Sequence, residues 1–489
     1  MKKYFKYIVA MSVLGVTGTS CHKELLDPIP QTSVTDATAF DTPDRILTQV
    51  RSIYGAFKNG NFYGGRYVVY GDIRGEDYLN ETSNLVTAFD VWGLNAQGTS
   101  QNSIKNLWSQ AYYTINLANL FIEGMAEKGT AVVGSALSNN YLGEARFLRA
   151  VCYYSLLQYY ARPYADGNGS KPGLPLRLKG IKGSGASDLA RSTVAEVYNQ
   201  IIADLNFAET SLPLDYTGTT QATLRTTRAH RNTAIAFKTR VFLSMQRYAD
   251  VITEANKIVS AAAPFTATTG VPHALQANIV DVFTTYTTTE SILSMPMSVT
   301  SPDFPGIQNQ LGHYFYNNGS VGSAEYRLNP TGIIANTEWT ATDARRTSLI
   351  YTNTSNAKLF LAKYKTPNPY TDYVPVIRYA EVLLNLAEAL ARTATGVDAR
   401  AIALLNAVRK RSDPTTTLAP ATQAALIDAI LLERRIEFLG EGLRNNDLMR
   451  LLQTIPAKGS APAKTPAEQG YIWPISSDEL SLNALMTDN

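Results

Sequence analysis

The chain has 489 residues, with 44 basic and 41 acidic side chains and a formal net charge of +3. Because the two signs nearly cancel, no strong field exists that would attract nucleic acid or an anionic membrane surface. Charged residues make up only 17% of the chain, whereas tyrosine alone occurs 28 times. Such a polar but weakly charged composition suits an uncharged polar ligand.

The first twenty residues have the pattern of an export signal. Three lysines precede an apolar stretch at 7–16 that is too short to span a bilayer, and small residues then lead into Cys21. This pattern resembles a bacterial lipoprotein signal, in which residues 1–20 are removed and Cys21 is acylated; an ordinary cleaved signal is the alternative. The only other cysteine, Cys152, lies in an apolar helical run typical of a buried free thiol. We therefore expect an exported protein without disulfides, anchored to a membrane through lipid on Cys21.

Paired helical patterns recur along the chain. Residues 103–161, 233–259 and 377–411 place apolar side chains at steps of three and four, and the last two contain a short break at Arg247 and Gly396. Alanines recur where two helices would approach closely. The pattern indicates loosely spaced hairpins of the tetratricopeptide type. We count four such pairs, the third preceded by the helical run TVAEVYNQIIADLNFAETSLP.

Two long segments, 57–103 and 264–330, differ in composition from the helices. They are rich in glycine, asparagine, threonine and aromatic residues and show no sustained helical period. Loops of this length inside a compact domain are usually functional or disordered, and the aromatic content argues against disorder. The alternating run SILSMPMSV predicts one of the few strands. The two segments are therefore where a ligand site is expected.

The most heavily charged stretch is ERRIEFLGEGLRNNDLMR, residues 433–450. Its charges fall among apolar residues of a predicted helix, so some of them must lie against packed helices, where an unpaired charge is costly. We expect a structural network of ion pairs, with Arg378 and Glu381 as partners and a further pair between Arg444 and Asp447. A catalytic pair of carboxylates is the alternative. The charges expected in the network are Glu433, Arg434, Arg435, Glu437 and Glu441.

The sequence offers no other catalytic chemistry. The four histidines are scattered, and apart from His22 beside Cys21 none lies near another histidine or cysteine, so no zinc site is predicted. The sequence has no G-x-S-x-G nucleophile turn and no glycine-rich phosphate loop. We expect no catalytic residue, no metal and no cofactor.

Five motifs in order carry a family resemblance: CHKELLDPIPQTSVTDATAF, GEARFLRAVCYYSLLQYYARPY, VIRYAEVLLNLAEAL, ERRIEFLGEGLR with DLMR, and YIWPISSDELSLN. Together they cover nearly the whole chain, which resembles the SusD/RagB family of surface-exposed outer-membrane lipoproteins of Bacteroidetes. The resemblance implies an all-α fold of four tetratricopeptide-like pairs forming a right-handed scaffold, with long irregular loops and a few short strands. It also implies one domain at 21–489, divided into helix pairs (21–263), a loop-rich insertion (264–345) and a C-terminal signature region (346–489).

The resemblance also implies a function. Family members sit as lids over a SusC-like, TonB-dependent transporter and capture glycans or, in some members, peptides for import. They are binding proteins and not enzymes. For this chain the resemblance implies a protein at the cell-surface face of the outer membrane, with a glycan or peptide ligand and the transporter as partners.

Aromatic side chains are the expected glycan contacts, because a sugar ring packs its C–H face on an aromatic face while polar side chains meet its hydroxyls. Trp108, Trp473 and Trp339 are assigned to the core. Trp92 lies in a loop with polar neighbours, although a tryptophan covering a hairpin is an equal alternative. We expect a shallow platform for a neutral oligosaccharide, with Phe62 and Tyr63 as a weaker addition. Its proposed residues are Asp90, Trp92, Asn95, Tyr314, Phe315, Tyr316 and Asn317.

Two rival functions share parts of this pattern. A peptide-binding lid would have the same fold and anchor but would need a groove able to meet backbone amides. A tetratricopeptide scaffold that only binds protein partners would leave the loop aromatics without a role. An enzyme would release reducing ends from a glycan, and we expect none.

Overall fold

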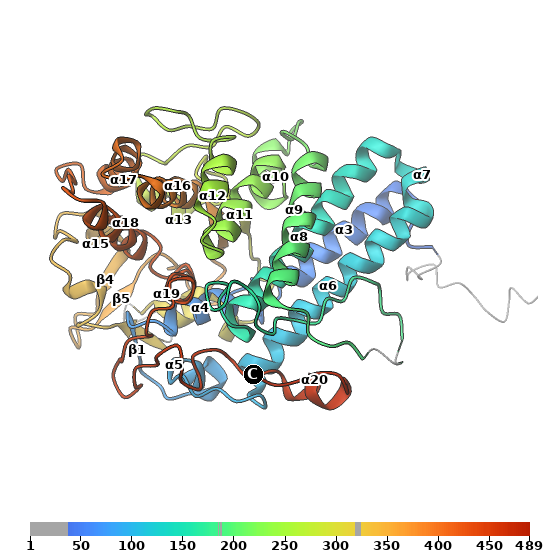
Figure 1. The fold of residues 1–489 in the computed structure, drawn as a ribbon, viewed down its shortest axis with the longest axis horizontal. Helices are drawn as coiled ribbons and strands as arrows, with labels where there is room; N and C mark the ends of the chain where they lie inside the picture. The colour runs from blue at the N-terminus through green and yellow to red at the C-terminus, as the bar shows by residue number, and fades with distance from the viewer. Residues whose placement is uncertain (1–37, 184, 186–187, 318–323) are drawn as a thin grey trace, which may run out of the picture.

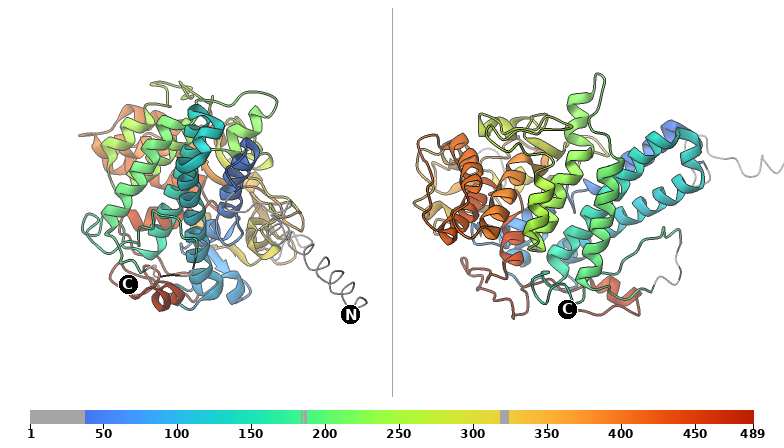
Figure 2. Two further views of the ribbon diagram at one scale, coloured as in Figure 1. Left: turned by 90° about the vertical axis from the view of Figure 1, so that its right-hand side faces the viewer. Right: turned by 45° about the horizontal axis from the view of Figure 1, so that its top comes forward.

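The computed structural model describes residues 38–489 apart from 184, 186–187 and 318–323. Long helices follow one another across the molecule, from residues 43–57 and 106–160 at one end to residues 379–437 at the other (Figure 1). Figure 2 shows the same succession in two further views, with the C-terminus near the lower edge. The proposed signal and Cys21 lie outside the described residues.

The N-terminal half forms a continuous series of packed helices. The long helices pack on one another in order: α3 packs on both α6 and α8, α8 packs on α9, α9 packs on α11, and α11 packs on α12. Capping side chains fix several starts: Thr42 accepts the Arg45 N–H at α3, and Thr193 and Glu196 form a capping box at α9. The bounds are α3 (Pro43–Phe57), α6 (Asn106–Gly124), α7 (Thr130–Val133), α8 (Ser135–Tyr160), α9 (Val194–Ser211), α10 (Gln221–Thr227), α11 (Arg231–Ser244) and α12 (Tyr248–Ala255).

The C-terminal helices continue the series, since α12 packs on α16 and α16 packs on α17 and α18. Asp398 and Thr422 cap the starts of α17 and α18. The bounds are α15 (Ala344–Leu349), α16 (Tyr379–Thr393), α17 (Ala399–Ser412), α18 (Gln423–Glu437), α19 (Arg444–Arg450) and α20 (Ser477–Leu482). The predicted hairpins therefore correspond to α6 with α8, α11 with α12 and α16 with α17, and the predicted breaks at Arg247 and Gly396 are confirmed.

The strands of the described residues are short and form three antiparallel pairs, β1 with β3, β2 with β6 and β4 with β5. Their bounds are β1 (Tyr78–Asn80), β2 (Ser291–Met295), β3 (Tyr326–Leu328), β4 (Ile350–Thr352), β5 (Leu359–Leu361) and β6 (Val374–Arg378). The strand predicted from SILSMPMSV is β2. Two of the pairs join segments distant in sequence, with Tyr78 opposite Leu328 and Ser291 opposite Arg378, so these two sheets tie the long connections to one another. The strands β4 and β5 are neighbours in the chain.

The two segments predicted as loops contain short helices that the sequence pattern did not reveal. The elements are α4 (Arg66–Ile73), η1 (Leu85–Thr87), α5 (Phe89–Trp92), η2 (Gln101–Lys105), α13 (Ile279–Thr284), η4 (Ile307–Asn309) and α14 (Leu311–Phe315). Every residue of α4 is buried. A helix buried on all sides has no polar face and hence no amphipathic period to detect.

Aromatic side chains from these segments pack inward. Phe57 stacks on Tyr63 with ring centroids 4.4 Å apart, and Tyr63 contacts Tyr67 at 4.6 Å. The series continues through Tyr159, which stacks on Trp473 at 4.5 Å. The aromatic segments are therefore part of the core that joins the helical layer to the tail.

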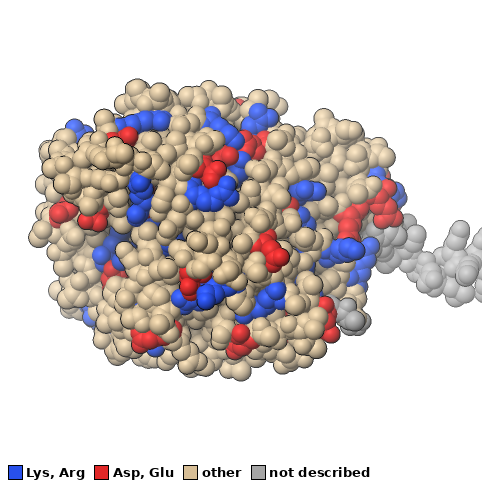
Figure 3. Space-filling model, viewed as in Figure 1, with Lys and Arg blue, Asp and Glu red and all other residues tan. Residues whose placement is uncertain are grey.

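The surface in Figure 3 is mostly uncharged, with lysine and arginine interspersed among aspartate and glutamate. This distribution agrees with the near-zero net charge and shows no large patch of one sign on that face. Among the described residues, no helix combines the length and apolar character needed to cross a bilayer.

Candidate functional site

The charged stretch at 433–450 forms a buried network of ion pairs, as predicted. Arg378 contacts Glu437 at 3.1 Å and Glu441 at 2.7 Å, and Arg345 contacts Glu433 at 2.5 Å. Within the described residues the connected cluster has five acids and five bases, so its charge balances. Its members are Glu290, Asp343, Glu433, Glu437, Glu441, Arg345, Lys363, Arg378, Arg409 and Arg411.

Two of the predicted partners are wrong. Glu381 pairs with Arg240 at 2.6 Å and does not join the cluster. Arg444 pairs with Glu76, which also contacts Arg435. The carboxylate of Asp447 instead contacts Arg434 and Arg450. Sequence proximity favoured the pairing of Arg444 with Asp447, but the helix directs these side chains towards different neighbouring elements.

The structure overturns the exposed platform at Trp92. Its side chain is only 4% exposed, and its indole N–H donates to the carbonyl of Tyr78 at 2.8 Å. The buried Lys458 ammonium lies 5.8 Å from the ring centroid and donates to the Arg74 and Gly75 carbonyls. Trp92 is therefore a buried side chain, and its indole N–H has its partner inside the fold.

The second predicted group is buried as well. Tyr314 and Phe315 are fully buried on α14, and Tyr316 is 9% exposed. Phe315 packs on Tyr78 at 4.8 Å, so this group and Trp92 both reach β1, but from within the core. Asn317 is half-buried beside them. Burial also raises the pKa of Tyr314. These rings offer no open face to a sugar.

The weaker pair, Phe62 and Tyr63, belongs to the aromatic series of the core and is buried. Trp108, Trp339 and Trp473 are buried, as predicted. The three aromatic groups were predicted to be exposed and are buried for the same reason. A segment without a helical period can still supply core side chains when tertiary packing encloses it.

Asp90 and Asn95 do reach a surface hollow, which we call the Phe89 cavity. Its volume is about 440 Å³. It lies along α5 and the start of η2; α5 is near the lower edge of Figure 1. It is lined by Leu85, Phe89, Asp90, Asn95, Gln97, Ser100, Gln101 and Asn102.

The Phe89 cavity combines one aromatic ring with several amides. The half-buried Phe89 ring stacks on Trp92 with centroids 5.7 Å apart and planes inclined by 19°. The side-chain amides of Asn95 and Asn102 make no hydrogen bond to the described residues. Asp90 accepts the Val91 N–H at 2.9 Å and the Ser103 hydroxyl at 3.3 Å, which leaves further carboxylate lone pairs free. A sugar ring could therefore stack on Phe89 while its hydroxyls form hydrogen bonds with the side-chain amides.

The sequence reasoning missed Phe89, Gln101 and Asn102. Phe89 precedes Trp92 by one helical turn, and a tryptophan is the stronger glycan signal of the two. The amide-rich run NAQGTSQN at 95–102 was the available signal. The hydrogen bond from the Trp92 indole to the Tyr78 carbonyl turns Trp92 inward. Phe89 is therefore the ring that lines the cavity.

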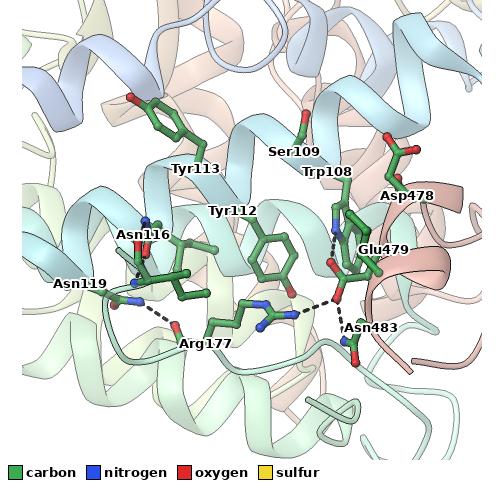
Figure 4. A pocket seen from close by; sticks show the side chains of 14 residues that line it. Trp108, Ser109, Tyr112, Tyr113, Asn116, Asn119, Arg177, Asp478, Glu479 and Asn483 are labelled. Carbon is green, nitrogen blue, oxygen red and sulfur yellow. Dashed lines mark hydrogen bonds and ion pairs between the residues drawn. The ribbon is translucent and has the colours of Figure 1, made fainter. Parts of the chain in front are cut away.

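Another hollow lies between α6, the loop at 177–183 and α20, with a volume of about 350 Å³ (Figure 4). Glu479 there accepts hydrogen bonds from the Trp108 indole at 3.2 Å, from Arg177 at 3.0 Å and from Asn483 at 2.7 Å. The Asn116 amide bonds to both the N–H and the C=O of Ile181. Since these polar groups satisfy one another, they leave fewer free partners for a ligand than the Phe89 cavity does.

No group of three or more histidine, cysteine, aspartate or glutamate side chains that could hold a metal ion occurs in the part of the chain that the structure describes. His230 and His273 lie together, stacked with centroids 5.2 Å apart. Burial and His273 lower the pKa of His230 well below its ordinary value. The pair therefore belongs to the uncharged core.

Comparison with known proteins agrees with this architecture. The family model described as SusD family matches residues 307–489, and the model described as starch-binding associating with outer membrane matches residues 29–243. A SusD superfamily protein from Bacteroides fragilis is 30% identical, with a TM-score of 0.80 over 92% of this chain and 99% of its own. The chain belongs to the SusD/RagB family.

Other known proteins resemble the chain over similar lengths. SusD-like protein P38 of Formosa agariphila is 24% identical over 97% of both chains. The solved laminarin binding SusD-like protein is 21% identical, with a TM-score of 0.73 over 92% of this chain and 99% of its own. The surface glycan-binding protein A from Bacteroides uniformis is also 21% identical over the same shares, with a TM-score of 0.72. The family and the mostly helical, tetratricopeptide-like SusD fold are thus confirmed.

Proposed function

We propose that the protein is a glycan-binding lipoprotein of the outer-membrane surface. It captures a neutral oligosaccharide or polysaccharide in the Phe89 cavity and delivers it to a SusC-like, TonB-dependent transporter. Cys21 carries the lipid anchor, and the protein has no catalytic role. The observation that carries the proposal is an aromatic face beside free side-chain amides in one open hollow.

Family membership supports this proposal. One matching family is described as starch-binding and associated with the outer membrane. Of two solved relatives, one is described as laminarin binding and the other as a surface glycan-binding protein. The Phe89 cavity supplies the chemistry that such a ligand requires, since one ring face and a few amides recognise a sugar without any charge.

The binding test is retention of the protein in gels containing starch, laminarin or xylan. One stacking contact contributes on the order of 1 kcal/mol, so Phe89→Ala should weaken binding by roughly fivefold to tenfold. Tyr113→Ala is the matched control, because Tyr113 is an aromatic residue, 55% exposed, at the α6 hollow of Figure 4. Equal weakening by both variants, or by the control alone, would contradict the assignment to the Phe89 cavity.

The same proteins separate the competing functions. Calorimetry with a peptide mixture would reveal a peptide-binding lid if heat is released with peptides and not with the glycans. New reducing ends after incubation would reveal an enzyme. In the native host, Cys21→Ala should move the protein from the membrane fraction to the soluble fraction, and the wild type should co-purify with a TonB-dependent barrel.

A further inference from the structure

The Phe89 cavity adjoins a second hollow across one short loop. The second hollow, which we call the tail cavity, has a volume of about 490 Å³ and shares Asn95 and Gln97 with the Phe89 cavity. Both side chains are exposed. Each cavity falls in the range of roughly 300–1,000 Å³ that is usual for small-ligand sites. The two cavities are therefore neighbours, separated by the loop that carries Asn95 and Gln97, and we call this loop the crest.

Hydrogen bonds hold this crest in one conformation. The Asn95 N–H donates to the Asp90 carbonyl at 3.1 Å, and the Gln97 side-chain amide donates to the Asn95 carbonyl at 2.8 Å. The Ser477 N–H donates to the Gly98 carbonyl at 3.0 Å, which joins the loop to the C-terminal tail. A ligand that crosses the crest would thus meet an ordered surface and would not have to order it on binding.

The lining of the tail cavity suits a continuation of the same ligand. Leu94, Ile472 and Pro474 supply the apolar part of the lining, and Lys464 and Gln469 supply polar ends. The charged residues Arg162, Glu468 and Asp488 also line the cavity. The Gln469 amide and the Lys464 ammonium donate no hydrogen bond to the described residues. Hydrogen bonds from Thr465 and, to a smaller extent, the Lys464 charge lower the pKa of the neighbouring Glu468 carboxyl, but Lys464 and Glu468 form no salt bridge. An apolar floor with unused donors at its edge fits the C–H face and the hydroxyls of a pyranose ring.

We propose that one glycan chain lies across the crest and fills both cavities, so that the protein selects oligosaccharides long enough to span Asn95 and Gln97. This inference rests on the proposed glycan-binding function and adds a requirement for chain length. Phe89 holds one part of the chain, and Lys464 and Gln469 hold the next part. Mono- and disaccharides occupy one cavity only and bind more weakly.

Calorimetry with malto- and laminari-oligosaccharides, from disaccharide to octasaccharide, tests this inference. For whichever of the two oligosaccharide series binds, the affinity of the wild-type protein should rise with the length of the oligosaccharide and then level off. The double variant Lys464→Met with Gln469→Ala keeps the apolar floor and removes two donors. Two hydrogen bonds correspond to roughly tenfold in affinity, and this loss should appear for long chains only.

Gln308→Ala is the matched control, since Gln308 is an exposed glutamine that lines neither cavity. Long chains that bind the double variant as tightly as the wild type, while Phe89→Ala still weakens them, would overturn the two-cavity inference and leave the proposed function intact. An affinity independent of length would overturn it as well. Failure of every oligosaccharide to bind the wild type would count against the proposed function itself, and the inference would fall with it.

Discussion

Glu437 is the side chain through which the buried ion cluster can be tested most directly. Its carboxylate contacts Arg345 at 2.8 Å and Arg378 at 3.1 Å, and it also pairs with Arg411. Glu437→Gln keeps the shape of the side chain and removes one negative charge. The cluster of five acids and five bases would then contain four acids and an uncompensated buried cation.

Glu437→Gln should lower the free energy of unfolding substantially. Removing one partner of a buried ion pair typically costs about 3–5 kcal/mol, because the remaining charge stays desolvated without a counter-ion. Surface substitutions away from such features usually change stability by less than about 0.5 kcal/mol. Glu127→Gln, on the exposed segment after α6, is the matched control. Urea unfolding should therefore show a lower midpoint with an unchanged slope for Glu437→Gln alone.

The loss of stability in Glu437→Gln should also depend on pH. Burial alone would raise the pKa of Glu437, but the guanidinium groups of Arg411, Arg378 and Arg345 hold it well below its ordinary value of 4.5. A depressed folded-state pKa means that the charged carboxylate contributes stability above about pH 4.5 and loses it as the pH falls towards the folded pKa. The difference between wild type and Glu437→Gln should thus narrow on acidification.

Two outcomes would refute this reasoning. A loss below about 1 kcal/mol at neutral pH would mean that the cluster tolerates an unpaired cation, as a solvated surface network does. Unchanged stability combined with lost glycan retention would place Glu437 in a ligand site. Folded Glu437→Gln protein should instead bind glycan like the wild type.

Three further predictions follow from single buried side chains. Trp92→Ala should destabilise the fold by about 3–5 kcal/mol in urea unfolding, since it empties a packed site; a nearly unchanged midpoint would mean that the ring lies at the surface. Burial raises the pKa of Asp72 from 3.8 to about 8, so the wild type should lose stability as the pH rises through that window, while Asp72→Asn should not. Parallel stability curves for the two proteins between pH 5 and pH 8 would contradict this pKa. The Cys152 thiol is buried and its pKa is raised by burial, so in a Cys21→Ala background it should react with a thiol reagent only after denaturant is added; rapid labelling of the folded protein would refute its burial.

The helical hairpins could be predicted because their signal is local. Runs such as 377–411 repeat apolar residues at steps of three and four, and α16 with α17 forms there. The ion cluster was also predictable in kind, because charges on an apolar helix must find partners. The individual pairs were harder to predict. Glu381 pairs with Arg240, which is 141 positions away in the chain, and no local pattern encodes that contact.

The ligand site was predictable only in part. Asp90 and Asn95 were identified, but Trp92, Tyr314 and Phe62 were expected outside and lie inside. An aromatic residue in an irregular segment gains more from burial in a core than from exposure whenever the packing offers it a place. That place was created by β1 and β3, which pair residues about 250 positions apart in sequence.

The sequence by itself determined the family, the helical scaffold and the weakly charged surface, because these follow from local periodicity, ordered motifs and composition. Tertiary structure alone decided which ring is available to a ligand. The Trp92 indole N–H bonds to the Tyr78 carbonyl and turns the larger ring inward, which leaves Phe89 on the rim. A buried donor must find an acceptor, and only the folded chain brings that acceptor within reach.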